Sequence, residues 1–557
     1  MQDAETVGEA WLQLLADRGV DFLFANSGTD FPSIVEGLAR AEQLGTRVPR
    51  AVIAPHENAA VSMAHGHAMV SGRAQAVMVH VNVGTANAVS GLLNADRDYV
   101  PMLLAAGRTP VLEGGAPGAR SLNIHWAQEM FDQAGMVREA VKWDYELRDP
   151  RQLIPATDRA LALAHSAPRG PVYLSLPREL LAMPPAEPDI PPARLAPVEA
   201  LGPDPRAVAA AAAALSRAER PLIVTARAGA DRRVPALLSQ LAARLAAPVV
   251  EYRPRHLNLS TDDPLHGGFE VSPHLATADV VLVLDCDVPW IPDTERPAPG
   301  ATIIQAGEDP LQARYVSRGF PADITLRASA APLLQALLAE LGNAAPPPSR
   351  RTAAEAACQA RRTTPFTLDA PPARMSMGWV SFCLDQLRAP DSLLVNEYPL
   401  HRGVMRTTEP GSFFGSSPMG SLGWGLPAAL GAKLAAPNRE VIAALGDGCL
   451  IFANPVACHQ IAAAENLAIL VVVFNNRRWG AVDRATRALY PDGFAARANR
   501  MPLTSLEPAP DHARIAEACG LYGRGVADPA ALPAALRGAL AAVRAGRSAL
   551  LDVLCDG

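Results

Sequence analysis

The residues between Gly446 and Asn476 carry the clearest chemical signal in this sequence. An apolar run, EVIAAL, leads into Gly446-Asp447-Gly448, and a second apolar run ends at Asn475-Asn476 after 26 intervening residues. Parallel strands joined by a helix end at the same edge of a sheet, so a carboxylate and an amide oxygen are expected to lie together there. Such oxygens are ligands of hard cations such as Mg²⁺, which often retain substrate phosphates.

The surroundings of Asp447 favour a phosphorylated ligand. The flanking glycines let the backbone approach such a ligand closely. The helix expected to follow would present its N-terminus, where a diphosphate is stabilised. The sequence therefore predicts a Mg²⁺-diphosphate anchor at the carboxyl end of a parallel sheet, although an ordinary turn with a capping aspartate could contain the same residues.

Elements that could position this site recur along the chain. Apolar runs of strand length alternate with amphipathic stretches, which predicts α/β architecture with parallel sheets. Pro-rich linkers after residue 185 and around residues 343–374 divide the 557 residues into three segments. We expect three doubly wound parallel-sheet domains: residues 1–185, residues 186–345 and residues 370–557.

Composition excludes several classes of function. The net charge is −6 and basic residues form no long run, so neither nucleic-acid nor membrane-surface binding is expected. Apolar runs are far shorter than the ~18 residues of a transmembrane helix, and the N-terminal residues do not resemble a signal peptide. Seven scattered cysteines favour a reducing compartment, so we expect a cytoplasmic protein.

The GDG triplet followed by paired asparagines resembles the signature of thiamine diphosphate (ThDP) enzymes. This resemblance covers nearly the whole chain and implies pyrimidine-binding, middle and diphosphate-binding domains in that order. It implies that Mg²⁺ is bound by the side chains of Asp447 and Asn476 and the main-chain carbonyl of Arg478. Gly446 and Gly448 would then lie against the diphosphate.

The resemblance also implies how the cofactor is activated. Glu57, between the run AVIAPH and a helix-like stretch, occupies the position of the glutamate that activates the pyrimidine ring; a first-turn glutamate favoured by the helix dipole would look the same. Burial would make such a carboxyl more effective. Leu422, in PMGSLGWGLPAALG, takes the place of the apolar residue that bends the cofactor, and Asn87 and Glu397 are expected beside the cofactor.

Several runs resemble benzoylformate decarboxylase more than other members, among them NEYPLHRGVM and HVNVGTANAVSG. His80 falls on the catalytic histidine of that enzyme, and imidazole can exchange protons near neutral pH. A histidine satisfied by loop carbonyls is the alternative. Thr29 stands where that enzyme has an active-site serine; it could bind a substrate carboxylate or cap the next helix.

Some positions depart from the pattern. The middle-domain loop VVLVLDCDVPWIPDTERP has no second catalytic histidine; Trp290 there could line a pocket or pack in the core. Cys449 replaces a frequent serine, and Tyr398-Pro399-Leu400-His401 replaces a hydroxyl-rich diphosphate contact, which makes His401 a candidate contact. His125 is a further candidate acid or base, and Gln128 matches a cofactor-proximal glutamine of acetohydroxyacid synthases.

The expected function is therefore that of a ThDP- and Mg²⁺-dependent 2-oxoacid decarboxylase, which forms an aldehyde through an enamine/carbanion intermediate. The alternative is a carboligase like acetolactate synthase, which forms acyloins. A non-catalytic family member and a nicotinamide oxidoreductase are less favoured, because Glu57 and the metal pair are present and no GxGxxG follows a strand. Family sites form between subunits, so a homodimer or homotetramer acting on a small 2-oxoacid is expected.

Overall fold

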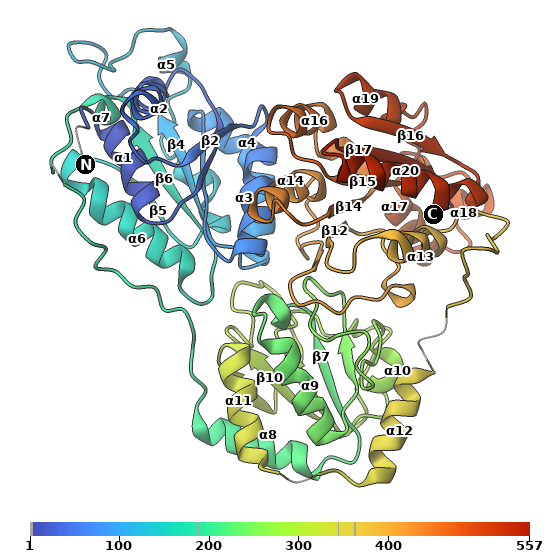
Figure 1. Cartoon of the computed structure of the whole chain (residues 1–557). Helices are drawn as coiled ribbons and strands as arrows, with labels where there is room; N and C mark the ends of the chain where they lie inside the picture. The colour runs from blue at the N-terminus through green and yellow to red at the C-terminus, as the bar shows by residue number, and fades with distance from the viewer. Residues whose placement is uncertain (1–3, 188, 344, 361–363, 557) are drawn as a thin grey trace.

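The computed structural model of the chain describes residues 4–187, 189–343, 345–360 and 364–556. Three sheets of six, five and six strands follow one another along the chain, and neighbouring strands within each are parallel. Helices cover both faces of each sheet (Figure 1). The predicted fold class, three doubly wound parallel-sheet domains, is confirmed.

The first sheet separates two apolar layers. Along its strands, Leu23, Met78 and Leu103 face one layer, whereas Phe24, Val77 and Leu104 face the other. Its strand order is β2-β1-β3-β4-β6-β5. The strands are β1 (Phe22–Asn26), β2 (Arg50–Ile53), β3 (Ala76–Val79), β4 (Met102–Arg108), β5 (Asp144–Glu146) and β6 (Pro171–Pro177). The helices are α1 (Val7–Asp17), α2 (Pro32–Leu44), α3 (Glu57–Ser71), α4 (Val81–Arg97), α5 (Ile124–Ala127), α6 (Leu153–His165) and α7 (Arg178–Ala182).

The middle sheet has the order β11-β10-β9-β7-β8 and an apolar cluster on each face. Its strands are β7 (Pro221–Thr225), β8 (Val249–Glu251), β9 (Val280–Leu284), β10 (Thr302–Gly307) and β11 (Ile324–Arg327). Its helices are α8 (Pro205–Arg217), α9 (Val234–Leu245), α10 (Ser272–Leu275) and α11 (Ala330–Leu341). A further helix, α12 (Pro348–Gln359), occupies part of the segment predicted as an exposed linker.

The third sheet has the order β13-β12-β14-β15-β17-β16. Its strands are β12 (Leu393–Glu397), β13 (Phe413–Gly415), β14 (Val441–Gly446), β15 (Leu470–Asn475), β16 (Tyr522–Val526) and β17 (Ala549–Leu554). Its helices are α13 (Met377–Leu387), α14 (Gly425–Ala435), α15 (Asp447–Phe452), α16 (Pro455–Ala464), α17 (Gly480–Leu489), α18 (Phe494–Arg497), α19 (His512–Ala518) and α20 (Leu532–Arg544).

One apolar core joins the first and third domains, which lie side by side above the middle domain in Figure 1. Helices α3 and α14 cross there in backbone contact. A methyl group added at Gly66 would lie 1.9 Å from the carbonyl oxygen of Ala428, and one added at Gly431 would lie 1.9 Å from that of Met63. Only glycine permits so close a crossing at these two positions.

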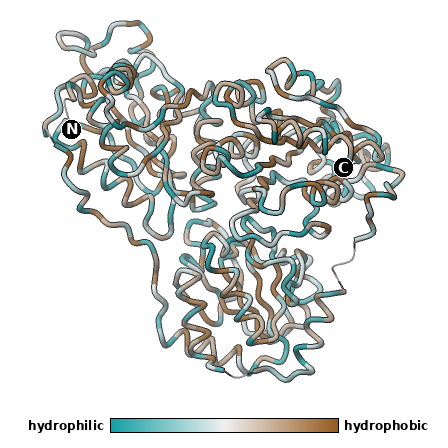
Figure 2. The backbone as a smooth tube through the Cα atoms, viewed as in Figure 1, coloured by the Kyte–Doolittle hydropathy of each residue, from teal (hydrophilic) through white to brown (hydrophobic). Residues whose placement is uncertain are grey.

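The apolar segments lie mainly inside the three domains, as the hydropathy colouring in Figure 2 shows. In the part of the chain that the structure describes, no helix combines the length and the apolar character that crossing a membrane requires.

Candidate active site

Asp447 lies where the sequence predicts it, at the junction between β14 and α15. The register of β14 and β15 pairs Gly446 with Phe474, which places Asp447 beside Asn475 at the carboxyl edge of the sheet. The Asp447 side chain is buried, and burial raises the pKa of its carboxyl, whereas backbone N–H groups of Gly448 and Arg477 oppose that shift. A neighbouring positive charge would stabilise the ionised form of such a buried carboxyl.

The two asparagines after β15 have different surroundings. The Asn475 side chain donates to Asp552 at 2.8 Å and accepts the backbone N–H of Arg477 at 3.1 Å. Both of its polar atoms are therefore already hydrogen-bonded within the protein. The Asn476 side-chain oxygen accepts only the backbone N–H of Arg478, at 3.1 Å, and this residue is half-buried. Asn476 is therefore the asparagine whose side-chain oxygen can still bind a cation, and its role as a ligand stays a prediction.

The available donors form a mixed oxygen set. The main-chain oxygen of Arg478 accepts one N–H, from Gly480 at 2.9 Å, which leaves a second lone pair. Among the described residues, no group of three or more His, Cys, Asp or Glu side chains could hold a metal. A carboxylate, an amide oxygen and a carbonyl suit Mg²⁺, which keeps its remaining positions for water and phosphate oxygens.

Gly448 is fixed by close packing. A methyl group there would lie 2.2 Å from the ring of Trp479, which also contacts Phe452 edge to face at 5.7 Å between centroids. Cys449 is buried with its thiol 3.8 Å from the main-chain oxygen of Glu397, and burial raises the pKa of that thiol. The Cys449 side chain thus points at the neighbouring strand end.

Glu397 holds the loop that carries Leu422. Its two carboxylate oxygens accept the backbone N–H groups of Gly423 and Gly425 at 2.8 and 2.7 Å, and the side chain is buried. Gly423 has a φ of +86°, and a methyl group there would meet the Phe452 carbonyl oxygen at 2.5 Å. Glu397 therefore acts on the loop in this structure, and the half-buried Leu422 is positioned by it.

Glu57 begins α3 and is buried. Its oxygens accept side-chain N–H groups from Asn26 at 2.9 Å and from Asn87 at 3.0 Å. Asn26, which the sequence analysis missed, ends β1 in the same way that Asn475 ends β15. Its position at a strand end was the available signal.

The first and third domains of one chain meet at this point. The Asn94 side chain donates to the Ser421 carbonyl at 2.8 Å, and that of Asn58, next to Glu57, donates to the Gly423 carbonyl at 3.5 Å. The resemblance placed these two halves on different subunits. Here a single chain brings the start of α3 to the Leu422 loop, and the predicted homodimer or homotetramer stays a prediction.

His80 lies directly after β3, and its ring contacts two polar side chains. Its Nδ1 lies 2.5 Å from Asp30 Oδ1, and its Nε2 lies 3.3 Å from Gln128 Nε2. The alternative of a histidine satisfied by loop carbonyls is therefore not what the structure shows. Asp30 was missed by the sequence analysis, although it directly follows Thr29.

The other first-domain candidates differ in their surroundings. Thr29 is exposed and does not cap α2, whose N-cap is Phe31. His125 is buried, and its Nδ1 accepts the backbone N–H of Ser121 at 3.1 Å. Burial lowers the pKa of His125, and nearby positive charges, His80 among them, lower it further.

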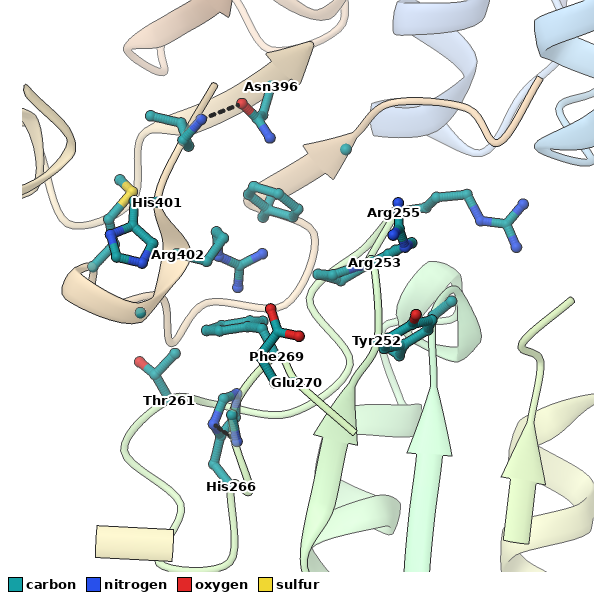
Figure 3. A pocket seen from close by; sticks show the side chains of 18 of the residues that line it. Tyr252, Arg253, Arg255, Thr261, His266, Phe269, Glu270, Asn396, His401 and Arg402 are labelled. Carbon is teal, nitrogen blue, oxygen red and sulfur yellow. Dashed lines mark hydrogen bonds between the residues drawn. The ribbon is translucent and has the colours of Figure 1, made fainter. Parts of the chain in front are cut away.

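A cavity of about 1060 Å³ lies between the middle and third domains. In Figure 3, Tyr252 and Arg253 line it from the middle domain, and Asn396, His401 and Arg402 line it from the third. His401 is exposed in this cavity, and its backbone N–H donates to Ser381.

Tyr398 connects this cavity to the Leu422 loop, whereas Trp290 lies in the core of the middle domain. Tyr398, which also lines the cavity, has a φ of +83°, and its hydroxyl would lie 3.4 Å from a methyl group at Gly420, where the Leu422 loop begins. Trp290 is 2% exposed and packs edge to face on Phe320, so it belongs to the core of the middle domain. Of its two predicted roles, core packing is the observed one.

Comparison with known families gives three matches in chain order. Residues 5–136 match the thiamine pyrophosphate enzyme N-terminal TPP binding domain, residues 208–337 match the central domain, and residues 399–553 match the C-terminal TPP binding domain. Thiamine pyrophosphate is another name for ThDP, so the cofactor expected from the GDG motif agrees with these matches.

Similar proteins cover almost the whole chain. Sulfoacetaldehyde acetyltransferase from Rhodobacter capsulatus is 29% identical over 99% of this chain and 94% of its own. Benzoylformate decarboxylase from Pseudomonas aeruginosa is 28% identical over 86% of this chain and 87% of its own. The structure of a 4-hydroxybenzoylformate decarboxylase from Rhodococcus jostii RHA1 covers 99% of both chains at a TM-score of 0.79 and 23% identity, a likeness that concerns the fold.

Proposed function

Because the chain belongs to the family of thiamine diphosphate-dependent enzymes, we propose that it is a ThDP- and Mg²⁺-dependent 2-oxoacid decarboxylase of the benzoylformate decarboxylase type. The observation that carries this proposal is the contact of Asn58, the neighbour of Glu57, with the Leu422 loop, which packs in turn on Phe452 at the end of α15, the helix that Asp447 begins. The groups that we assign to binding and to activating the cofactor are thus connected through this loop.

The residues present fit both the metal and the cofactor. Asp447, Asn476 and the carbonyl of Arg478 would hold Mg²⁺, because each has an unused oxygen lone pair and Asp447 is a buried carboxylate. Gly446, where an added methyl group would meet only the Cys449 sulfur at 3.8 Å, leaves room for the diphosphate, whereas Gly448 is packed against Trp479. When bound, ThDP supplies a nucleophilic carbon and a ring that accepts the electron pair released with CO₂, which is the chemistry of the cofactor itself.

In this proposal the protein orients the cofactor and keeps water away from its reacting ring. Glu57 would hold the pyrimidine ring through its carboxylate, and the amides of Asn26 and Asn87 fix that carboxylate in place. Leu422, held by the Glu397 contacts to Gly423 and Gly425, would support the ring that reacts. A preorganised, water-poor site of this kind strengthens each electrostatic contact within it.

His80 would supply the proton that completes aldehyde formation, through Nε2. The exposed hydroxyl of Thr29 would bind the substrate carboxylate, and His125 is the second proton carrier that we propose nearby. His401 faces the cavity between the middle and third domains, so we assign it to the rim of the site and not to the chemistry. The substrate is a small 2-oxoacid.

Carboligation is the second candidate reaction. Two observations favour it: the middle-domain loop around Trp290 contains no histidine, and Gln128, which matches an acetohydroxyacid synthase position, contacts His80. With fewer proton donors at the site, a second carbonyl compound would compete better for the reacting carbon and give an acyloin.

A product assay separates the two reactions. The enzyme, supplied with ThDP and Mg²⁺, is incubated with pyruvate or benzoylformate, each alone and with an added aldehyde. We expect CO₂ and the aldehyde with one carbon fewer. Formation of acetolactate from pyruvate would reverse the order of the two candidates. Cofactor binding without turnover of any 2-oxoacid would instead favour a non-catalytic member of the family.

A further inference from the structure

The contact between Asp30 and His80 joins two segments of the first domain. Asp30 lies in the loop between β1 and α2, and His80 lies between β3 and α4. Asp30 Oδ1 is 2.5 Å from His80 Nδ1, and Asp30 Oδ2 accepts the backbone N–H of Val81 at 3.3 Å. The carboxylate is 3% exposed, whereas the imidazole is 18% exposed. The buried carboxylate thus holds the Nδ1 edge of the imidazole, and the rest of the ring is partly accessible.

Glycines on both sides leave this pair little freedom. A methyl group at Gly28 would lie 2.2 Å from the His80 ring, and one at Gly107, on β4, would lie 1.6 Å from Asp30 Oδ2. Val81 has a φ of +32°, a strained value for a β-branched residue, directly after His80. Strain of this kind persists only where the surroundings enforce it, and here it accompanies the turn that brings His80 over Asp30.

The donor and acceptor inventory fixes the tautomer. An ionised carboxylate can only accept, so His80 Nδ1 must carry the proton in this contact. The neutral ring then has its free lone pair on Nε2, which accepts the side-chain N–H of Gln128 at 3.3 Å. A carboxylate at Nδ1 also stabilises the ring after Nε2 has taken up a proton.

We propose that Asp30 is the positioning residue for His80: it keeps the proton on Nδ1 and leaves Nε2 as the atom that exchanges protons with the substrate. This inference rests on the proposed function. When the charged ring acts, the Nε2–H bond breaks, its electron pair stays on Nε2, and the proton goes to the substrate. The Nδ1–H bond to Asp30 is unchanged, and a proton from solvent restores Nε2–H.

A purely structural role for Asp30 makes a different prediction. In that case the carboxylate would serve only to cap α4 through the Val81 N–H. Its loss would then weaken the fold to the same extent whether or not His80 is present. If Asp30 acts through His80, its effect on turnover must disappear when the imidazole is removed.

The kinetic test is therefore a double-mutant cycle with Asp30→Asn, His80→Ala and the double variant. We expect Asp30→Asn alone to lower kcat at least about tenfold, with ThDP affinity unchanged, because an amide at Nδ1 permits the wrong tautomer. In the His80→Ala background the same change should alter kcat less than about twofold. Equal factors in both backgrounds would overturn the proposal.

The pH profile gives a second kinetic readout. Without the carboxylate the charged ring is less stable, so the alkaline limb of the kcat profile should move to lower pH in Asp30→Asn. Asp204→Asn is the matched control: Asp204 caps α8 through the Arg206 N–H and contacts no histidine, so its profile should match that of the wild type. An unmoved limb in Asp30→Asn would contradict the proposal.

Two further measurements keep the test independent of folding and of turnover. If Asp30→Asn does not fold, Gly28→Ala breaks the same contact from the His80 side and should give the same kinetic changes. In ¹⁵N-histidine spectra, the His80 signals, assigned by their loss in His80→Ala, should show the proton on Nδ1 even if no 2-oxoacid is turned over. A proton on Nε2 would refute the positioning role, whereas absent turnover alone would refute only the proposed function.

Discussion

Replacing Glu57 by glutamine tests the activation site most sharply. The Glu57 carboxylate is 6% exposed and accepts amide N–H groups from Asn26 and Asn87 at 2.9 and 3.0 Å. Glutamine keeps the shape, but its NH₂ group would face one of these donors. Leaving one buried donor unsatisfied costs about 1–3 kcal/mol of folding free energy.

The expected effect on turnover is larger than the effect on stability. Losing an acid–base group at the reacting centre lowers kcat by about 10²–10⁴-fold. ThDP affinity should change little, because the diphosphate and the metal bind at Asp447 and Asn476, on the third domain. Glu57→Gln should therefore bind cofactor and fail to turn over.

The assay combines CO₂ release, ThDP binding and thermal unfolding. Glu9→Gln is the matched control, because Glu9 is equally buried and lies on α1, which packs on the opposite face of the first sheet from α3. It should lose stability and keep kcat. Full activity in Glu57→Gln would refute the assigned role.

Further predictions concern the domain junction and the proton carrier. Gly66→Ala should lower the free energy of unfolding by about 1–3 kcal/mol, because the added methyl group would overpack against the Ala428 carbonyl. Gly525→Ala is the control, because a methyl group there would lie in open space. Equal melting temperatures of the two variants would contradict this prediction. His80→Ala should lower kcat by about 10²–10⁴-fold at unchanged ThDP affinity, and unchanged kcat in stopped-time assays would exclude His80 as the proton carrier.

The contact of the first domain with the middle domain predicts a pH dependence: burial raises the pKa of Asp98, near Arg255, to about 7 from an ordinary 3.8. Between these values the folded state holds a proton that the unfolded state has released, so Asp98 makes stability fall as pH rises from about 4 to about 7. Asp98→Asn should remove this fall, and a wild-type-minus-variant difference in melting temperature that is equal at pH 5 and pH 8 would argue against it.

The sequence predicts every central strand and also three edge strands, β2, β8 and β11. Central strands such as β14 and β15 are continuous apolar runs because helices cover both of their faces. The strands missed, β5, β13 and β16, are all at sheet edges. β16, for example, contains Gly523 and Gly525 and is largely exposed, so no apolar pattern marks it.

Site residues that belong to a local motif can be predicted from the sequence better than site residues that depend on contacts between distant segments. Strand ends and spacing predict that Asp447 lies beside the Asn475-Asn476 pair, and the family resemblance selects Asn476 as the expected ligand. The pairing of Asp30 with His80 depends on Gly28 and Gly107, which lie on different segments, and no periodicity shows that they meet. The resemblance placed Glu397 beside the cofactor, which stays a prediction. Its carboxylate accepts the backbone N–H groups of Gly423 and Gly425, a contact that only the folded geometry shows.

The central claim is that two side-chain oxygens at the carboxyl edge of the third sheet hold Mg²⁺ and, through it, ThDP. Equilibrium dialysis of the purified protein with ThDP, with and without Mg²⁺, tests it directly. We expect tight uptake that needs Mg²⁺ in the wild type and none in Asp447→Ala. Absence of uptake by the wild type with Mg²⁺ present, or undiminished uptake by Asp447→Ala, would contradict the account.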